Sequence, residues 1–144
     1  MFKFKKSYYI DRPQQEVFDY ATDPTNDTKW RESAVSSEWI SEGPVGVGSK
    51  LRSVDKLLGR KIESVSEISA WDPPNEYGQK ADGGPVPFEL MIRLQPEGSG
   101  TRLDVEGQAE IGGFFKMAEG LAGKQFEKQF DADFNGLKRV LEGG

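Results

Sequence analysis

The sequence contains neither cysteine nor histidine, and these two absences exclude several classes of site. Without cysteine the protein has no disulfide bonds, which suits a reducing cytoplasm, where we expect it to reside. Ser-His-Asp and Cys-His nucleophilic sites are excluded, as is a zinc site built on Cys or His. The sequence also has no acidic loop of EF-hand spacing, so we expect no metal and no cofactor. Any catalysis would have to use Asp, Glu, Lys, Tyr or Arg.

Basic stripes and long apolar runs are missing too. The formal net charge is −5, and no cluster of Lys and Arg is present to neutralise phosphates, so we expect no nucleic-acid partner. The opening residues MFKFKKSYYID alternate and carry charge, so we expect no signal peptide and no integral membrane segment. With 144 residues, 35% hydrophobic and 30% charged, the composition favours one soluble domain over residues 1–144.

What the sequence does contain is a series of segments that alternate with period two, which is typical of strands. The first covers residues 2–10, with Lys6 interrupting its apolar face. Others lie at residues 35–39, 50–55, 62–68, 77–81, 88–94 and 101–111, separated by short turns. Val35, Ser37 and Trp39 are predicted to share one face. Consecutive strands joined by short turns pair antiparallel, so we expect one antiparallel sheet that is covered on one side.

Two short helices are predicted between the first two strands. Asp11-Arg12-Pro13 is typical of a helix start. Thr22-Asp23-Pro24 ends this helix and begins a second one that ends near Trp30.

The C-terminal segment predicts a long amphipathic helix from about Phe114 to Leu141. One apolar stripe recurs at helical spacing and consists of Phe126, Phe130, Phe134, Leu137 and Leu141. Gly120 and Gly123 are unusual inside a helix. They either remove side chains beside a cavity or mark a kink or close packing. A sheet with one helix as its only large cover must curl around that helix.

The segment Trp71-Asp72-Pro73-Pro74-Asn75-Glu76-Tyr77 lies between two predicted strands. Adjacent prolines lack backbone donors and cannot lie inside a central strand, so the segment predicts a corner where the sheet turns. We expect Trp71 to pack at the end of the sheet and Tyr77 to face a cavity.

Three stretches, in this order, carry a family resemblance: YYIDRPQQEVFDYATDPTNDTKW, LLGRKIESVSEISAWDPPNEY and GSGTRLDVEGQAEI. With the terminal helix they resemble the START/Bet v 1-like (SRPBCC) superfamily, and especially its bacterial polyketide cyclase/dehydrase-like members. The resemblance covers nearly the whole chain. It implies an α+β helix-grip fold, in which a curved antiparallel sheet of about seven strands wraps around a long C-terminal helix, with two short helices after the first strand.

The resemblance also implies a cavity between sheet and helix that binds or transports a hydrophobic small molecule, lipid- or polyketide-like. The candidate ligand-binding residues are large apolar side chains: Trp30, Trp39, Leu51, Tyr77, Phe88, Leu90, Leu103, Val105, Phe114, Met117, Leu121 and Phe126. For each of them the alternative is ordinary core packing.

Several polar and surface features have two interpretations. Lys6 is either an anchor for a ligand carboxylate or an ordinary lysine near a strand end. Inward polar side chains are either ligand anchors or a wet stretch of sheet, and they are Ser37, Ser53, Asp55, Ser64, Ser66 and Thr101. Leu57-Leu58 and Phe114-Phe115 either rim a portal, form a homodimer contact or are covered by a loop.

Two other functions compete with ligand binding. The first is a cyclase- or aromatase-like enzyme. Asp55 is its best general-base candidate, but the sequence indicates no paired inward carboxylates, so we assign no catalytic residue. The second is a protein-interaction module of the co-chaperone or stress-response kind.

Overall fold

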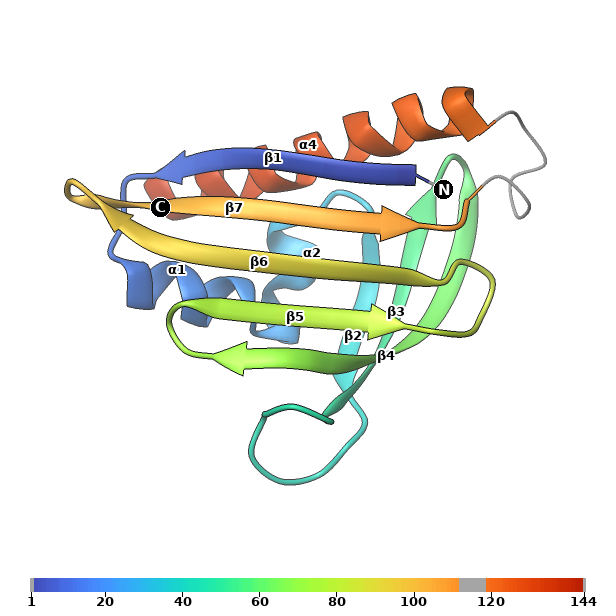
Figure 1. The fold of residues 1–144 in the computed structure, drawn as a ribbon, viewed down its shortest axis with the longest axis horizontal. Coiled ribbons are helices and arrows are strands. Elements are labelled where there is room, and N and C mark those ends of the chain that lie inside the picture. The colour runs from blue at the N-terminus through green and yellow to red at the C-terminus, as the bar shows by residue number, and fades with distance from the viewer. Residues whose placement is uncertain (1, 112–118, 144) are drawn as a thin grey trace.

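The computed structural model describes residues 2–111 and 119–143, and it shows a curved antiparallel sheet with one long helix (Figure 1). Seven strands form the sheet in the order β1-β7-β6-β5-β4-β3-β2. In chain order the elements are β1 (Phe2–Ile10), α1 (Gln14–Ala21), the 3-10 helix η1 (Pro24–Asn26), α2 (Asp27–Trp30), β2 (Ala34–Trp39), β3 (Lys50–Leu57), β4 (Arg60–Asp72), β5 (Glu76–Ala81), β6 (Phe88–Glu97), β7 (Gly100–Ala109) and α4 (Glu119–Gly143). The predicted helix-grip architecture is confirmed.

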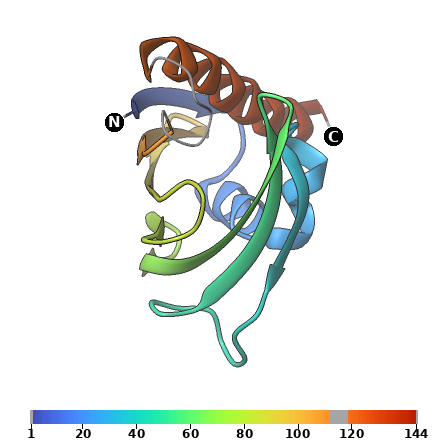
Figure 2. The same cartoon turned by 90° about the vertical axis from the view of Figure 1, so that its right-hand side faces the viewer.

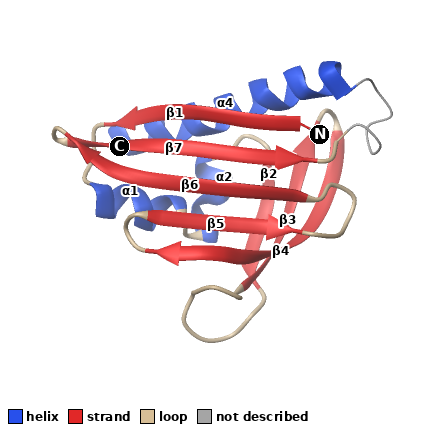
Figure 3. Cartoon of the chain, viewed as in Figure 1, coloured by secondary structure: helices blue, strands red, loops and turns tan. Residues whose placement is uncertain are grey.

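The helices share one face of the sheet. In Figure 3 they all lie behind the strands, and Figure 2 shows that this face is concave, with α4 across its open side. The first part of the predicted terminal helix, including Phe114 and Met117, lies outside the described residues. Among the described residues, no helix has the length and apolar content needed to cross a membrane.

The predicted apolar stripe is what holds α4 on the sheet. Phe126, Phe134, Leu137 and Leu141 are buried, and the partly buried Phe130 packs against the same core. The partners come from the apolar face of β1: Phe4 lies 5.8 Å from Phe130 and Tyr8 lies 5.3 Å from Phe134, measured between ring centroids. Burying a large apolar side chain contributes roughly 1.5–3 kcal/mol, so this seam is a main source of stability.

Strand β2 differs from the prediction at its start. A bulge between Ala34 and Ser36 shifts its register against β3, and Val35 is 45% exposed. The prediction that Val35 shares a face with Ser37 and Trp39 is therefore wrong. An extra residue in one strand moves the following side chains to the opposite face, and simple alternation does not reveal it.

The proline corner is confirmed between β4 and β5, and the Pro73–Pro74 peptide bond is cis. Trp71 packs edge-on against Phe18 of α1, with 5.2 Å between ring centroids. The side-chain amide of Gln14 donates to the backbone carbonyls of Pro74 and Leu94, both at 3.0 Å. The corner therefore fixes the start of α1 to the end of the sheet.

Helix α4 also packs closely on α2. A Cβ atom at Gly136 would overlap the carbonyl oxygen of Trp30. The backbone of α4 can therefore approach α2, which brings the polar residues of both helices together. These residues form one end of the candidate site.

Candidate functional site

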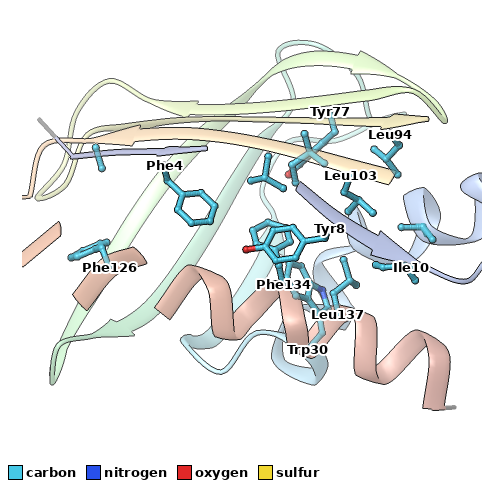
Figure 4. Close-up of a cluster of buried hydrophobic side chains, with 14 of the residues drawn as sticks. Phe4, Tyr8, Ile10, Trp30, Tyr77, Leu94, Leu103, Phe126, Phe134 and Leu137 are labelled. Carbon is cyan, nitrogen blue, oxygen red and sulfur yellow. The ribbon is translucent and has the colours of Figure 1, made fainter. Parts of the chain in front are cut away.

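The space between the concave sheet and α4 contains a cavity of about 130 Å³. Most of its wall is apolar. Phe2 and Phe4 come from β1, Phe88, Leu90 and Ile92 from β6, and Phe126, Phe130 and Phe134 from α4. In Figure 4, Phe4 on β1 and Phe134 on α4 point into the space between these two elements. A mostly apolar wall with some polar groups is the usual composition of a small-molecule site.

The structure places the predicted ligand-binding residues in four groups. Trp30, Tyr77, Phe88, Leu90 and Phe126 line the cavity. Leu51, Leu103 and Val105 are buried in the core outside the cavity wall, and Trp39 is partly buried against that core. Leu121 is 53% exposed on α4. Phe114 and Met117 lie outside the described residues, as does the Phe114-Phe115 pair.

The two helix glycines do not enlarge the cavity. Gly120 is exposed, and a Cβ there would meet no atom within 4 Å. At Gly123 a Cβ would lie 3.2 Å from Cδ1 of Phe2, so this glycine permits close packing of α4 on β1.

Arg31 forms the centre of the polar end of the cavity. Its guanidinium donates to Asp55 Oδ1 at 2.9 Å, and it lies 3.7 Å from carboxylate oxygens of both Asp27 and Asp133. All four side chains line the cavity. The expectation that no paired inward carboxylates exist is wrong, because folding brings carboxylates from three separate segments of the sequence around Arg31.

Asp133 is the most completely hydrogen-bonded of these carboxylates. It is 1% exposed and accepts from the backbone N–H of Glu32 at 2.9 Å, from the Ser33 hydroxyl at 2.7 Å and from Gln129 Nε2 at 3.1 Å. Hydrogen bonds of this kind stabilise a buried charge. Asp133 therefore ties α4 to the segment that follows α2.

Burial raises the pKa of Asp27 to about 6, although Arg31 acts in the opposite direction. Burial likewise raises the pKa of Asp55, against the effect of Arg31. Burial alone would lower the pKa of Arg31, but the three carboxylates outweigh it and raise that pKa. The cluster holds three carboxyl groups around one guanidinium.

Tyr77 continues the polar wall along the sheet. Its hydroxyl donates to Gln79 Oε1 at 2.8 Å, and Gln79 Nε2 donates to Ser66 Oγ at 2.6 Å. Burial raises the pKa of Tyr77 far above its ordinary value, and the charge of Asp27 adds to this effect. The tyrosine therefore stays protonated and acts as a donor.

The other predicted polar anchors lie at different places in the structure. Ser53, Asp55 and Ser64 line the cavity. The Thr101 hydroxyl donates to the backbone carbonyl of Arg12 at 2.8 Å. Lys6 pairs with Asp131 of α4 at 2.8 Å, and its side chain is 44% exposed outside the cavity wall.

Sequence reasoning missed Asp27, Arg31 and Asp133. A signal existed for Asp133, since Phe126, Phe130, Asp133 and Leu137 follow helical spacings of four, three and four. This spacing places a carboxylate inside the apolar stripe. No comparable periodicity marks Asp27, which begins a helix of four residues, or Arg31, which follows its end.

The outer face of the sheet carries a shallow groove of about 620 Å³. Its lining includes the charged side chains of Lys3, Lys5, Lys80, Glu89 and Glu106. This solvated surface suits an apolar ligand poorly. Within residues 2–111 and 119–143, no group of three or more acidic side chains could hold a metal ion.

Comparison with known proteins gives one family match. The sequence model of the family described as "Polyketide cyclase / dehydrase and lipid transport" matches residues 1–142. Comparison with curated protein sequences gives no match.

Solved structures share the fold over nearly all of the chain. TTHA0849 from Thermus thermophilus is 22% identical with a TM-score of 0.80, over 96% of each chain. A START superfamily protein from Mycobacterium smegmatis is 12% identical with a TM-score of 0.83, over 99% of each chain. Ara h 8.0201 is 14% identical with a TM-score of 0.74, over 99% of this chain and 98% of that chain. These similarities confirm the START/Bet v 1-like fold that the sequence resembles.

Proposed function

Because the chain belongs to the polyketide cyclase/dehydrase and lipid transport family, we propose that it binds a hydrophobic small molecule between the sheet and α4. The observation that carries this proposal is the cavity of about 130 Å³, with its aromatic wall and the polar cluster around Arg31. The apolar wall would supply affinity, and the polar end would orient the ligand.

The size of the cavity limits what fits without rearrangement. An apolar cavity of about 150 Å³ accepts a benzene-sized molecule, so the ligand proposed here is a single ring with a short substituent. A lipid- or polyketide-like ligand would have to push the wall outward, for example at Leu57 and Phe88. Burying roughly 250 Å² of apolar ligand surface would gain about 6 kcal/mol before the costs of association.

A cavity-filling variant tests this proposal. Gly107 lines the cavity on β7, and a Cβ there would make only ordinary contacts of 3.6 Å with Leu90 and Glu89. Gly107→Val therefore adds an isopropyl group to the cavity at a strand position that tolerates β-branching. The matched control is Gly46→Val, because a Cβ at Gly46 meets no atom within 4 Å and Gly46 does not line the cavity.

The measurement is calorimetric titration with ethylbenzene, together with native mass spectrometry of the purified protein. We expect wild type and Gly46→Val to bind ethylbenzene and Gly107→Val to lose binding while remaining folded. Equal binding by both variants would reject the cavity as the site. Absence of binding by the wild type would reject the proposal itself.

A cyclase- or dehydratase-like enzyme is the second candidate, and one observation favours it. Asp27 has a pKa of about 6 and lies in the cavity wall, so it can exchange a proton near neutral pH. In that case Asp27→Asn would abolish turnover of a polyketide-type substrate but keep its binding. Equal turnover by wild type and variant would remove this candidate.

A further inference from the structure

The polar end of the cavity holds three carboxyl groups and one guanidinium. Arg31 is the only basic side chain among the described residues that line the cavity, and it faces the carboxylates of Asp27, Asp55 and Asp133. We propose that the ligand carries a protonated amine that binds against Asp27, and that the site rejects carboxylates of the same shape. This inference rests on the proposed function and names the chemical class of its ligand.

Carboxylates of the protein surround the Arg31 guanidinium. It already donates to Asp55 at 2.9 Å and has two further carboxylates at 3.7 Å. A carboxylate ligand would add a fourth carboxyl group to a cluster that already holds three. Like charges placed together repel each other, so a carboxylate ligand should bind more weakly than an amine of the same shape.

Asp27 is the carboxylate with the most capacity to accept a new hydrogen bond. Asp133 is occupied by Ser33, Gln129 and backbone donors, and Asp55 by Arg31. Asp27 is 8% exposed, its contact with Arg31 at 3.7 Å is longer than a hydrogen bond, and it lines the cavity. An ammonium group would donate a hydrogen bond to the Asp27 carboxylate and place a positive charge beside the three carboxyl groups.

The aromatic wall near this end also suits a cation. Trp30 and Tyr77 both line the cavity, and the face of an aromatic ring attracts an ammonium group. Trp30 lies three residues after Asp27 on α2, so the two side chains are neighbours on one side of the helix. The described fold therefore places a carboxylate acceptor beside an aromatic surface.

The test compares three ligands of similar size and shape: 2-phenylethylamine, phenylacetate and ethylbenzene. Each is titrated calorimetrically into the intact wild-type protein at pH 7.5, where Asp27 is mainly ionised. We expect 2-phenylethylamine to bind at least about tenfold more tightly than phenylacetate, and more tightly than ethylbenzene. Phenylacetate binding as tightly as the amine would overturn the inference.

Two variants test whether Asp27 causes the tighter binding of the amine. Asp27→Asn keeps the shape of the side chain and removes its charge, so the amine should lose most of its advantage over ethylbenzene. Asp82→Asn is the matched control, because the Asp82 side chain is 80% exposed and lies outside the cavity. This control should leave the ratio of the affinities for 2-phenylethylamine and ethylbenzene unchanged. A thermal melt of each variant checks that it is folded. If Asp27→Asn is unfolded, the inference is tested by the order of the three ligand affinities in the wild-type protein alone.

The ethylbenzene titration distinguishes a failure of the amine inference from a failure of the proposed function. If ethylbenzene binds and the amine binds no better, the amine inference fails while the apolar cavity remains a ligand site. If none of the three molecules binds, both fail. If the amine advantage persists unchanged in folded Asp27→Asn, its assignment to Asp27 is wrong.

Discussion

Gly136 of α4 lies directly against the carbonyl oxygen of Trp30 at the end of α2, with no room for a Cβ atom between them. This contact sets the distance between two helices that carry opposite sides of the polar cluster. Arg31 follows Trp30 in sequence, and Asp133 lies one turn before Gly136 on α4. The packing of one glycine is therefore coupled to the geometry of the cavity's polar end.

The first prediction concerns this contact. Gly136→Ala should destabilise the protein by about 1–3 kcal/mol, because α4 must move away from α2 to accommodate the methyl group. Chemical denaturation measures the change in unfolding free energy. The matched control is Gly120→Ala on the same helix, where the added Cβ meets no atom within 4 Å. The control should stabilise the helix by about 0.5–1 kcal/mol. Equal effects at both positions would contradict the close contact.

The second prediction concerns the pH dependence contributed by Asp27. Its pKa rises from 3.8 to about 6 on folding, so the folded state holds the proton more tightly than the unfolded state. The corresponding stabilisation is complete below about pH 3.8 and is lost as the pH rises through about 6. Asp27→Asn removes this dependence, so the variant should gain stability relative to wild type as the pH rises. The gain should be on the order of 2–3 kcal/mol between pH 3.8 and pH 7.

Parallel denaturant titrations of wild type and Asp27→Asn at pH 4, 5.5 and 7.5 measure this difference. The charged and titratable groups that act on or respond to Asp27 are Arg31, Asp55, Asp23 and Tyr77. They are present in both proteins, so the comparison isolates the titration of Asp27. A stability difference that is constant with pH would show that burial does not raise this pKa.

The third prediction concerns the proline corner. Gln14→Ala removes the amide that bonds to the carbonyls of Pro74 and Leu94, and it should cost about 1–2 kcal/mol of unfolding free energy. Gln15→Ala is the matched control, because Gln15 bonds only within its own helix, to Asp19, among the described residues. The control should change stability by less than about 0.5 kcal/mol. If the two alanine variants are equally stable, the corner does not anchor α1.

Local periodicity accounts for what the sequence predicted correctly. The strands from Phe2 to Ala109 follow from alternation, and α4 follows from the stripe that includes Phe126 and Phe134. The adjacent prolines at residues 73 and 74 predicted the corner. Each of these signals involves neighbouring residues, whose spacing determines which face of an element they share.

The features that the sequence did not predict depend on contacts between distant segments. Asp133 reaches Ser33 across 100 positions, and Arg31 reaches Asp55 across 24. Neither contact has a periodic signature. The bulge before Ser36 reverses the face of Val35 without changing the composition of the strand. Alternation predicts that Leu103 and Leu90 both face the inside of the sheet. Only Leu90 lines the cavity, whereas Leu103 is buried in the core, because the curvature of the sheet determines where space remains.

The most direct test of the account is whether an apolar molecule enters the space between the sheet and α4. Isotope-filtered NMR on the labelled protein with unlabelled ethylbenzene measures intermolecular NOEs, which report protons in close contact. We predict NOEs from ethylbenzene to the rings of Phe4, Phe126 and Phe134, which line the cavity. NOEs confined to outer-face residues such as Val65, or no intermolecular NOEs at saturating ethylbenzene, would contradict ligand binding in this cavity.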